Sequence, residues 1–376
     1  MSKTADVVVI GGGVIGLSSA YALARSGASV RVLDAGQPGQ ASAAAAGMLA
    51  PLAESGCPGP FVRMALDSLR RWPSFVAGLR EEAETPLDIL GPGMLRVART
   101  EAEEEALCAA LDWQETLGLP LHRLDAAEVR ALEPAVGPDV RAAVLSPLER
   151  HVEPRVLLRA LADACRCRGV RVRAGVAVTG FATAGARVTG VEMADDLVSG
   201  GQAVIAGGAW SAGLGRMLGV RLPIQPLRGQ ILALGPQTPL PVRHTLYAHG
   251  GYLVPRPDRR IIAGATEEHA GFEARTTDAG IGSLLKMAAT LVPDLAGAPL
   301  HSSWTGLRPV SADGLPLLGR VTGWDNVHVA TGHGRNGILL TPITGSLMAD
   351  HLLRSIPPPP AFDPARFLES SLCPSP

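Results

Sequence analysis

The chain has 376 residues, a formal net charge of -1 and 47% hydrophobic residues. This length and composition are sufficient for two hydrophobic cores. The near-neutral charge argues against nucleic acid or an anionic membrane as a partner. No segment reaches the ~18 uninterrupted apolar residues of a membrane span. The N-terminus lacks the features of a signal peptide, and the five cysteines are irregularly spaced. We therefore expect a cytoplasmic protein without a metal site.

Residues 6–34 read DVVVIGGGVIGLSSAYALARSGASVRVLD, a pattern of strand, glycine turn, helix and second strand. Gly11 permits the tight turn, Gly13 lets the backbone approach a pyrophosphate, and Gly16 lets the helix pack closely on the sheet. The helix N-terminus offers N–H groups to phosphates, and Asp34 can accept hydrogen bonds from a ribose hydroxyl. The segment predicts a Rossmann-type dinucleotide site, with NAD and FAD both open.

The remaining elements follow from hydrophobic periodicity and from Gly and Pro positions. Helices are predicted over residues 61–82, 101–117, 125–132, 154–169 and 281–291, and from Pro342 onward. Strands are predicted over residues 85–100 around a Gly-Pro-Gly turn, 170–181, 202–206, 221–265 and 326–331. The proline-rich tail from Pro357 to Pro376 is expected to be loosely ordered. Cys165 and Cys167, although close in sequence, should lie on different faces of a helix.

This order predicts an α/β protein, α+β overall, in which strand-rich insertions interrupt a doubly wound nucleotide domain. The FAD- or NAD-binding part is assigned to residues 1–85, 146–222 and 306–376. The substrate-binding part, built on an antiparallel sheet, is assigned to residues 86–145 and 223–305.

Several separated segments together resemble the FAD-dependent D-amino acid oxidase superfamily, and within it the glycine oxidases of thiamine biosynthesis. They are GGGVIG, ASAAAAGMLAP, HVEP, VIAGGAWS, YLVPR, GAT, GLRP with DGLPLLG, and GHGRNGILLTP, in the family's order over about residues 5–355. The resemblance implies non-covalent FAD rather than NAD.

The resemblance also implies which residues hold FAD. Val14 and Ile15 match pyrophosphate contacts, Asp34 and Ala35 the ribose edge, Ala41 and Ser42 a further cofactor segment, Ala46, Gly47 and Met48 the flavin ring, and Val178 the adenine. The loop of His333, Gly334, Arg335, Asn336 and Gly337, followed by Ile338 and Leu339, matches the pyrimidine end of the flavin. Small residues beside the ring would let backbone N–H groups reach its heteroatoms. A lone histidine is more often structural, so His333 is not assigned as a base.

Substrate binding in the resembled enzymes centres on the arginine of GLRP, here Arg308, whose guanidinium can grip a carboxylate through two hydrogen bonds. Tyr252 matches a tyrosine that binds the same carboxylate, and Arg335 matches a second pocket arginine. Glu267 and Gly334 depart from the resembled pattern, in which Met and Phe are common. We expect Glu267 to add negative charge near the substrate amine and Gly334 to enlarge the cavity.

The implied reaction is oxidative deamination of glycine, a small D-amino acid or a secondary amine, with hydride transfer to flavin N5. The products would be an oxo acid, ammonia or an amine, and hydrogen peroxide. A dehydrogenase that passes electrons to another carrier, an NAD-dependent dehydrogenase and a non-catalytic nucleotide-binding module are the alternatives. The expected partners are a small amino acid and oxygen, and the resemblance implies a homo-oligomer.

Overall fold

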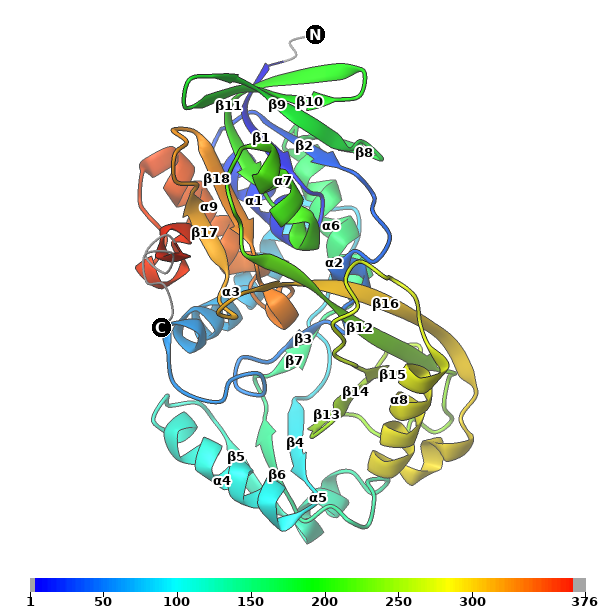
Figure 1. Cartoon of the computed structure of the whole chain (residues 1–376). Helices are drawn as coiled ribbons and strands as arrows, with labels where there is room; N and C mark the ends of the chain where they lie inside the picture. Colours follow the sequence, from blue (N-terminus) through cyan, green and yellow to red (C-terminus); the bar gives the residue numbers. More distant parts are fainter. Residues whose placement is uncertain (1–3, 368–376) are drawn as a thin grey trace, which may run out of the picture.

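The structure, a computed structural model, describes residues 4–367 and contains two large β-sheets, one above the other in Figure 1. The first sheet has the order β17 (Leu317–Arg320), β18 (Val327–Thr331), β11 (Asp196–Ile205), β1 (Thr4–Ile10), β2 (Val30–Asp34) and β8 (Arg171–Ala174), with β10 (Arg187–Met193) on β11 and β9 (Val178–Ala184) on β10. The second has the order β16 (Leu300–Ser311), β12 (Ile224–Leu234), β15 (Ile261–Gly264), β14 (Gly251–Pro255), β13 (Thr245–Ala248), β4 (Met94–Ala98), β6 (Ala142–Ser146) and β5 (His122–Asp125). A short pair joins β3 (Met48–Leu49) to β7 (Arg150–His151).

The helices are α1 (Val14–Arg25), α2 (Ala41–Ala44), α3 (Pro60–Glu82), α4 (Glu101–Glu115), α5 (Ala126–Leu132), α6 (Pro154–Cys167), α7 (Ser211–Met217), α8 (Asp278–Leu291) and α9 (Thr341–Arg354). Short 3₁₀ turns are η1 (Gly208–Trp210), η2 (Pro293–Gly297), η3 (Gly334–Asn336), η4 (Pro360–Phe362) and η5 (Pro364–Phe367). Within residues 4–367, no helix combines the length and the apolar character needed to cross a membrane.

The first sheet is parallel through β8, β2, β1, β11 and β18. Alternate residues of β1 enter two different cores, Val7 and Val9 on one face and Val8 and Ile10 on the other. Burial on both faces explains the continuous apolar run of this strand. The sheet is therefore the predicted doubly wound nucleotide unit.

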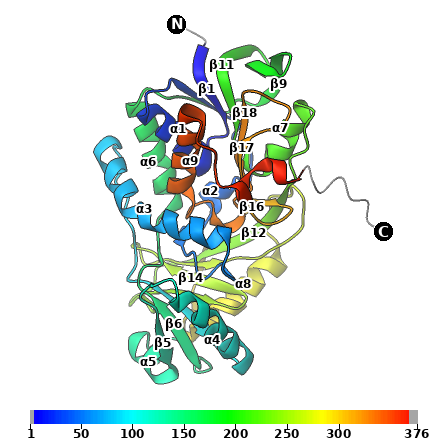
Figure 2. The same ribbon diagram turned by 90° about the vertical axis from the view of Figure 1, so that its left-hand side faces the viewer.

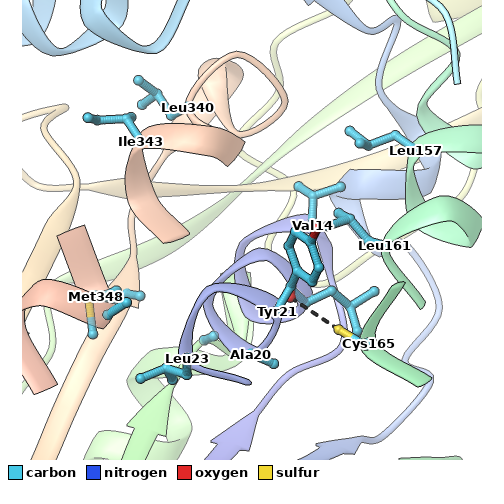
Figure 3. Packing of buried hydrophobic residues seen from close by; sticks show 14 of the residues in the cluster. Val14, Ala20, Tyr21, Leu23, Leu157, Leu161, Cys165, Leu340, Ile343 and Met348 are labelled. Atoms are coloured by element: carbon cyan, nitrogen blue, oxygen red, sulfur yellow. Dashed lines mark hydrogen bonds between the residues drawn. The ribbon is translucent and has the colours of Figure 1, made fainter. Parts of the chain in front are cut away.

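Helix α1 is the centre of the larger core, between α6 and α9 (Figure 3). Ala20 on α1 is fully buried, and the Cys165 Sγ on α6 donates to the carbonyl oxygen of Leu17, 3.5 Å away. Ser18 Oγ donates to the carbonyl oxygen of Thr341 at the start of α9, 2.7 Å away. These contacts fix the direction in which the N-terminus of α1 points.

The second sheet is antiparallel except where β13 pairs with β4. Its longest pair, β12 with β16, extends toward the first sheet, and both views show it below α2 (Figures 1 and 2). In this pair Gly229 lies opposite Gly306, and Leu227 lies opposite Arg308. One long ribbon thus carries Arg308 to the junction between the sheets.

Most predicted elements are confirmed, with four corrections. Only Met94–Ala98 is a strand within residues 85–100, because Leu90 makes a single bridge to His151 instead of a ladder. Residues 170–181 contain two strands, β8 and the start of β9, which pair with different neighbours. Strands β5, β6, β10, β16 and β17 were not predicted, and β13 was not distinguished within residues 221–265. Cys165 is buried and Cys167 exposed, as their spacing predicts.

The fourth correction concerns the tail. Phe362 is 1% exposed and belongs to the core around α1, so the chain is anchored to that point. Arg366 adds an ion pair with Asp313. Residues 368–376 of the predicted loose tail lie outside the described residues. The proposed domain boundaries stay predictions, and β16 crosses the one placed at 305/306.

Candidate active site

One cleft runs across the junction of the two sheets. It begins at the carboxyl ends of β1, β2 and β11, where an open α/β sheet binds its ligand. It continues between α2, β12 and β16 to Tyr252 and Arg308. Most of the predicted cofactor residues therefore line the same cleft as Arg308 and Tyr252, although they are spread from Gly11 to Ile338 in the sequence.

Eighteen of the twenty predicted FAD residues line this cleft, together with Gly207 and Gly208, which follow β11. The eighteen are Gly11, Gly13, Val14, Ile15, Asp34, Ala35, Ala41, Ser42, Ala46, Gly47, Met48, Val178, His333, Gly334, Arg335, Asn336, Gly337 and Ile338. Gly16 and Leu339 do not.

The glycine turn is shaped by close approaches between backbone segments. Gly11 has φ +119°, and a Cβ on it would lie 2.2 Å from the carbonyl oxygen of Ala206. A Cβ on Gly16 would lie 1.9 Å from the carbonyl oxygen of Gly11, so Gly16 fits the helix against the turn without facing the cleft. Val14 N–H donates to Ser42 Oγ at 3.1 Å, which ties the two predicted segments together.

Asp34 ends β2 at the position expected for a ribose contact. Gln40 Nε2 donates to both of its carboxylate oxygens, at 3.0 and 3.2 Å, and orients the group. Ala35 and Val178 line the cleft beside it. Asp34 is half-buried, so it can accept further hydrogen bonds from a ligand.

The Ala46–Met48 segment is clamped by a buried arginine that the sequence analysis did not select. Arg256 is 5% exposed and donates to the carbonyl oxygens of Ala46, at 2.7 Å, and Val152, at 3.2 Å. Gly47 has φ +86°, and its Cβ would lie 2.0 Å from the Val152 oxygen. Arg256 and the close approach to Val152 thus fix the path of the backbone beside the predicted flavin position.

The loop before α9 is a 3₁₀ turn, η3, preceded by the buried His333. Burial lowers the pKa of His333 to about 3, and its Nε2 lies 3.0 Å from Thr344 Oγ1. This environment fits the structural role expected for a lone histidine. Leu339 is fully buried, and its carbonyl oxygen accepts from Ser68 Oγ and Trp72 Nε1. Its side chain faces the core and does not line the cleft, and its role as a cofactor contact stays a prediction.

Arg308 projects from β16 across the face of Gly229. A Cβ on Gly229 would lie 2.5–2.6 Å from the guanidinium atoms, so any larger residue would displace the guanidinium from this position. Arg308 Nη1 donates to the carbonyl oxygen of Thr266 at 3.0 Å. Among residues 4–367 it has no carboxylate partner. A guanidinium that lines a cleft without an acid partner is placed to bind a carboxylate.

Tyr252 lies on β14, is 5% exposed and lines the same cleft. Burial raises the pKa of its hydroxyl, while the positive charges of Arg308 and Arg335 oppose the rise. The hydroxyl is thus a protonated donor within electrostatic range of both arginines.

Arg335 has a different environment from the one predicted. Its Nε lies 2.6 Å from Glu54 Oε2 and its Nη2 lies 3.0 Å from Oε1. Nη1 pairs with Glu267, and Nη2 also donates to Tyr247 Oη at 3.3 Å. Burial lowers the pKa of Arg335, but the charges of Glu54, Tyr247 and Glu267 outweigh that effect and raise it.

Two of these partners were missed by the sequence analysis. Glu54 has a side chain 7% exposed, and burial raises its pKa against the opposing charge of Arg335. It is the only charged residue between Asp34 and Arg63, a signal that could have identified it. Tyr247 does not belong to any of the motifs identified in the sequence. Glu267, predicted to face the substrate amine, instead contacts Arg335 and does not line the cleft.

The comparisons with known proteins agree with this geometry. A family model described as FAD dependent oxidoreductase, DAO, matches residues 6–351. The chain belongs to this family. It is therefore an FAD-dependent oxidoreductase of the glycine oxidase type, and FAD is its cofactor.

Individual relatives cover nearly the whole chain. Glycine oxidase from Geobacillus kaustophilus is 34% identical over 98% of this chain and 97% of its own length. The crystal structure of glycine oxidase from that organism superimposes with a TM-score of 0.90, covering 97% of this chain and 98% of that one at 33% identity. An iminodiacetate oxidase structure from Chelativorans sp. BNC1 has a TM-score of 0.85 at 27% identity, covering 95% and 98%.

Proposed function

We propose that the protein oxidatively deaminates glycine or another small amino acid, a D-amino acid or a secondary amine, and releases hydrogen peroxide. The observation that carries this proposal is Arg308, a guanidinium without a carboxylate partner among residues 4–367, in the cleft whose other end has the FAD-binding elements. The 34% identity to a glycine oxidase supports the reaction class.

The protein's part in the reaction is binding and orientation. Arg308 would take the substrate carboxylate through two parallel hydrogen bonds, and Tyr252 would donate to the same group. Rigid neighbours hold both, since Gly229 seats the guanidinium and β14 carries the tyrosine. A substrate bound in this way would have its Cα toward the Ala46–Met48 segment, and its amine would react in the neutral form.

The residues that line the cleft from Gly11 to Ile338 would hold FAD, which would supply the two-electron oxidation of the substrate, with oxygen as the final acceptor. Hydrolysis of the imine product by water then gives the oxo acid and ammonia, or an amine from a secondary amine. No side-chain base is required, which agrees with the burial of His333 and its low pKa. The closed packing of η3 and α9 would hold backbone N–H groups near the flavin.

A peroxide-coupled screen of the purified holoenzyme tests the proposal. Glycine, sarcosine, D-proline and common D-amino acids are offered, and oxygen uptake is recorded beside peroxide release. We expect equal rates of uptake and release with at least one small substrate. Turnover with an artificial electron acceptor but without oxygen uptake would favour a dehydrogenase instead. No turnover with any of them would refute the proposal.

Four further statements stay predictions. They are a cytoplasmic location, a homo-oligomeric state, a role in thiamine biosynthesis and the assigned domain boundaries.

A further inference from the structure

The two arginines of the cleft differ in how many of their donors are occupied. Arg308 contacts one backbone oxygen, that of Thr266, and keeps donors for a ligand. Arg335 contacts Glu54 through two nitrogens, Glu267 through a third, and Tyr247 as well. Since a guanidinium has five N–H donors, Arg335 has almost none left for a substrate.

The carboxylates around Arg335 also disfavour binding of a second anion. Glu54 and Glu267 both pair with one guanidinium, so Arg335 presents no net positive charge to a second anion. The group is partly buried, with Glu54 at 7% and Arg335 at 35% side-chain exposure. At such a site the solvent screens charges incompletely.

The group of Glu54, Arg335 and Glu267 adjoins the same cavity as the carboxylate site. Glu54, Arg335, Tyr252 and Arg308 all line the cleft. The charge of Arg308 acts on Glu54, and the charges of both arginines act on Tyr252. A small substrate bound to Arg308 would therefore have its far end within range of the Glu54 group.

Glu267 is held firmly in this position by its neighbours. Thr266 accepts from Arg308, and Glu268 forms a two-way backbone bridge with Arg228 at 2.9 and 3.0 Å. Arg228 also pairs with the Glu268 side chain. Thr266, Glu267 and Glu268 thus each contact a different arginine, and the arginine that Glu267 contacts is Arg335.

We propose that Glu267 is a specificity-determining residue that occupies the open edge of Arg335, so that the site accepts amino acids with one carboxylate and rejects those with a second anionic group. The proposal rests on the proposed function, because it assumes that Arg308 binds the substrate carboxylate. Removing Glu267 would take one negative charge from the group and free Nη1, and a second carboxylate could then bind Arg335.

Glu267 is the informative residue to change because it is 44% exposed, whereas Glu54 is buried. Replacing Glu54 would leave a half-buried guanidinium with one carboxylate fewer and risk the fold. Glu267→Gln keeps the shape and hydrogen-bonding capacity, and Glu267→Met removes both. If charge is the cause, the two variants change specificity in the same direction.

The first experiment measures binding without turnover. Holoenzyme is titrated with methoxyacetate, which matches sarcosine with oxygen in place of nitrogen, and with diglycolate, which adds the second carboxylate. Perturbation of the flavin absorbance gives each Kd. We expect wild-type protein to bind methoxyacetate more tightly, and both Glu267 variants to shift the Kd ratio toward diglycolate about tenfold, the effect of one partly screened charge.

Glu273→Gln is the matched control. It removes the same charge from the same loop, but Glu273 pairs with Arg228 and Arg275 rather than with Arg335. Its Kd ratio should stay at the wild-type value. An unchanged ratio in Glu267→Gln, an equal shift in the control, or a shift with Met alone would each overturn the proposal.

The second experiment compares kcat/KM for sarcosine and iminodiacetate. In Glu267→Gln the preference for sarcosine should fall about tenfold, mostly through the KM of iminodiacetate, and less at high salt. Turnover of sarcosine with an unaltered preference overturns this inference and leaves the proposed function intact. Absence of turnover with both substrates contradicts the proposed function, while the binding experiment still tests Glu267.

Discussion

The two ends of the cleft use glycine for different purposes. At the FAD end, Gly11 and Gly47 make room for backbone carbonyl oxygens of Ala206 and Val152, 2.2 and 2.0 Å from their missing Cβ atoms. At the substrate end, Gly229 instead makes room for the guanidinium of Arg308. The first end is therefore built by the path of the backbone, and the second by charged side chains that need space.

The same contrast appears in the ionisable groups. The buried histidine at the FAD end, His333, has a pKa lowered to about 3 and is held neutral. The substrate end keeps Arg335 charged among carboxylates. Substitutions at the FAD end should thus affect folding and FAD binding, whereas those at the substrate end should affect substrate use.

The largest expected effect is at Arg308. Among residues 4–367, Arg308 is the only cation of the cleft that lacks a carboxylate partner. Arg308→Met should lower kcat/KM about a thousandfold, because a bidentate charged contact to the substrate is worth several kcal/mol. FAD content, measured from the absorbance of the purified protein, should equal that of wild type. Loss of FAD together with activity would show that the two ends are not separable in this way.

Gly11→Ala should have the next largest effect, on the other end. A methyl group at φ +119° would collide with a backbone oxygen, so we expect about 3 kcal/mol of destabilisation and weaker FAD binding. Urea unfolding and FAD titration measure both.

Gly27→Ala is the matched control for Gly11→Ala. Gly27 has φ +94° but no atom within 4 Å of its Cβ position, so it isolates the conformational cost at about 1 kcal/mol. Equal effects of the two substitutions would mean that the close approach to Ala206 is unimportant.

The neutral state of His333 gives a pH test of the FAD end. Its folded pKa of about 3 lies below the unfolded value of ~6.5. The unfolded chain therefore binds the extra proton between these values, and stability falls as pH falls from about 6.5 toward 3. Between pH 7 and pH 5, the free energy of unfolding should therefore fall by about 2 kcal/mol less in His333→Gln than in wild type. Urea unfolding at the two pH values measures this difference. Parallel pH dependences in the two proteins would contradict this.

The contrast also explains how far the sequence could predict the site. The glycine turn and Asp34 were predicted because strand, turn, helix and acid are contiguous in the chain. Arg308 and Tyr252 were found only through a resemblance, since neither lies in a local pattern with chemical meaning. Glu54 was missed because its role depends on Arg335, 281 residues later, and such a pairing exists only after folding.

The environment of Glu267 was mispredicted for the same reason that Glu54 was missed. The sequence shows that Glu267 is negatively charged, but it does not show that Glu267 forms an ion pair with Arg335. Sequence patterns thus predict a site built from backbone better than a site built from paired side chains.

Gly229→Ala should have the smallest effect of these substitutions, and it tests the difference between the two ends of the cleft most directly. The added methyl group would lie 2.5 Å from Arg308 Nη1, but a guanidinium can move where a backbone carbonyl cannot. We expect a rise in KM of about tenfold with little loss of stability or FAD affinity, because the carboxylate site shifts while the fold adapts. Gly282→Ala, on α8 with no atom within 4 Å, is the control. Should Gly229→Ala instead destabilise the protein as much as Gly11→Ala does, the glycines of both ends would serve the backbone, and the distinction between the two ends would fail.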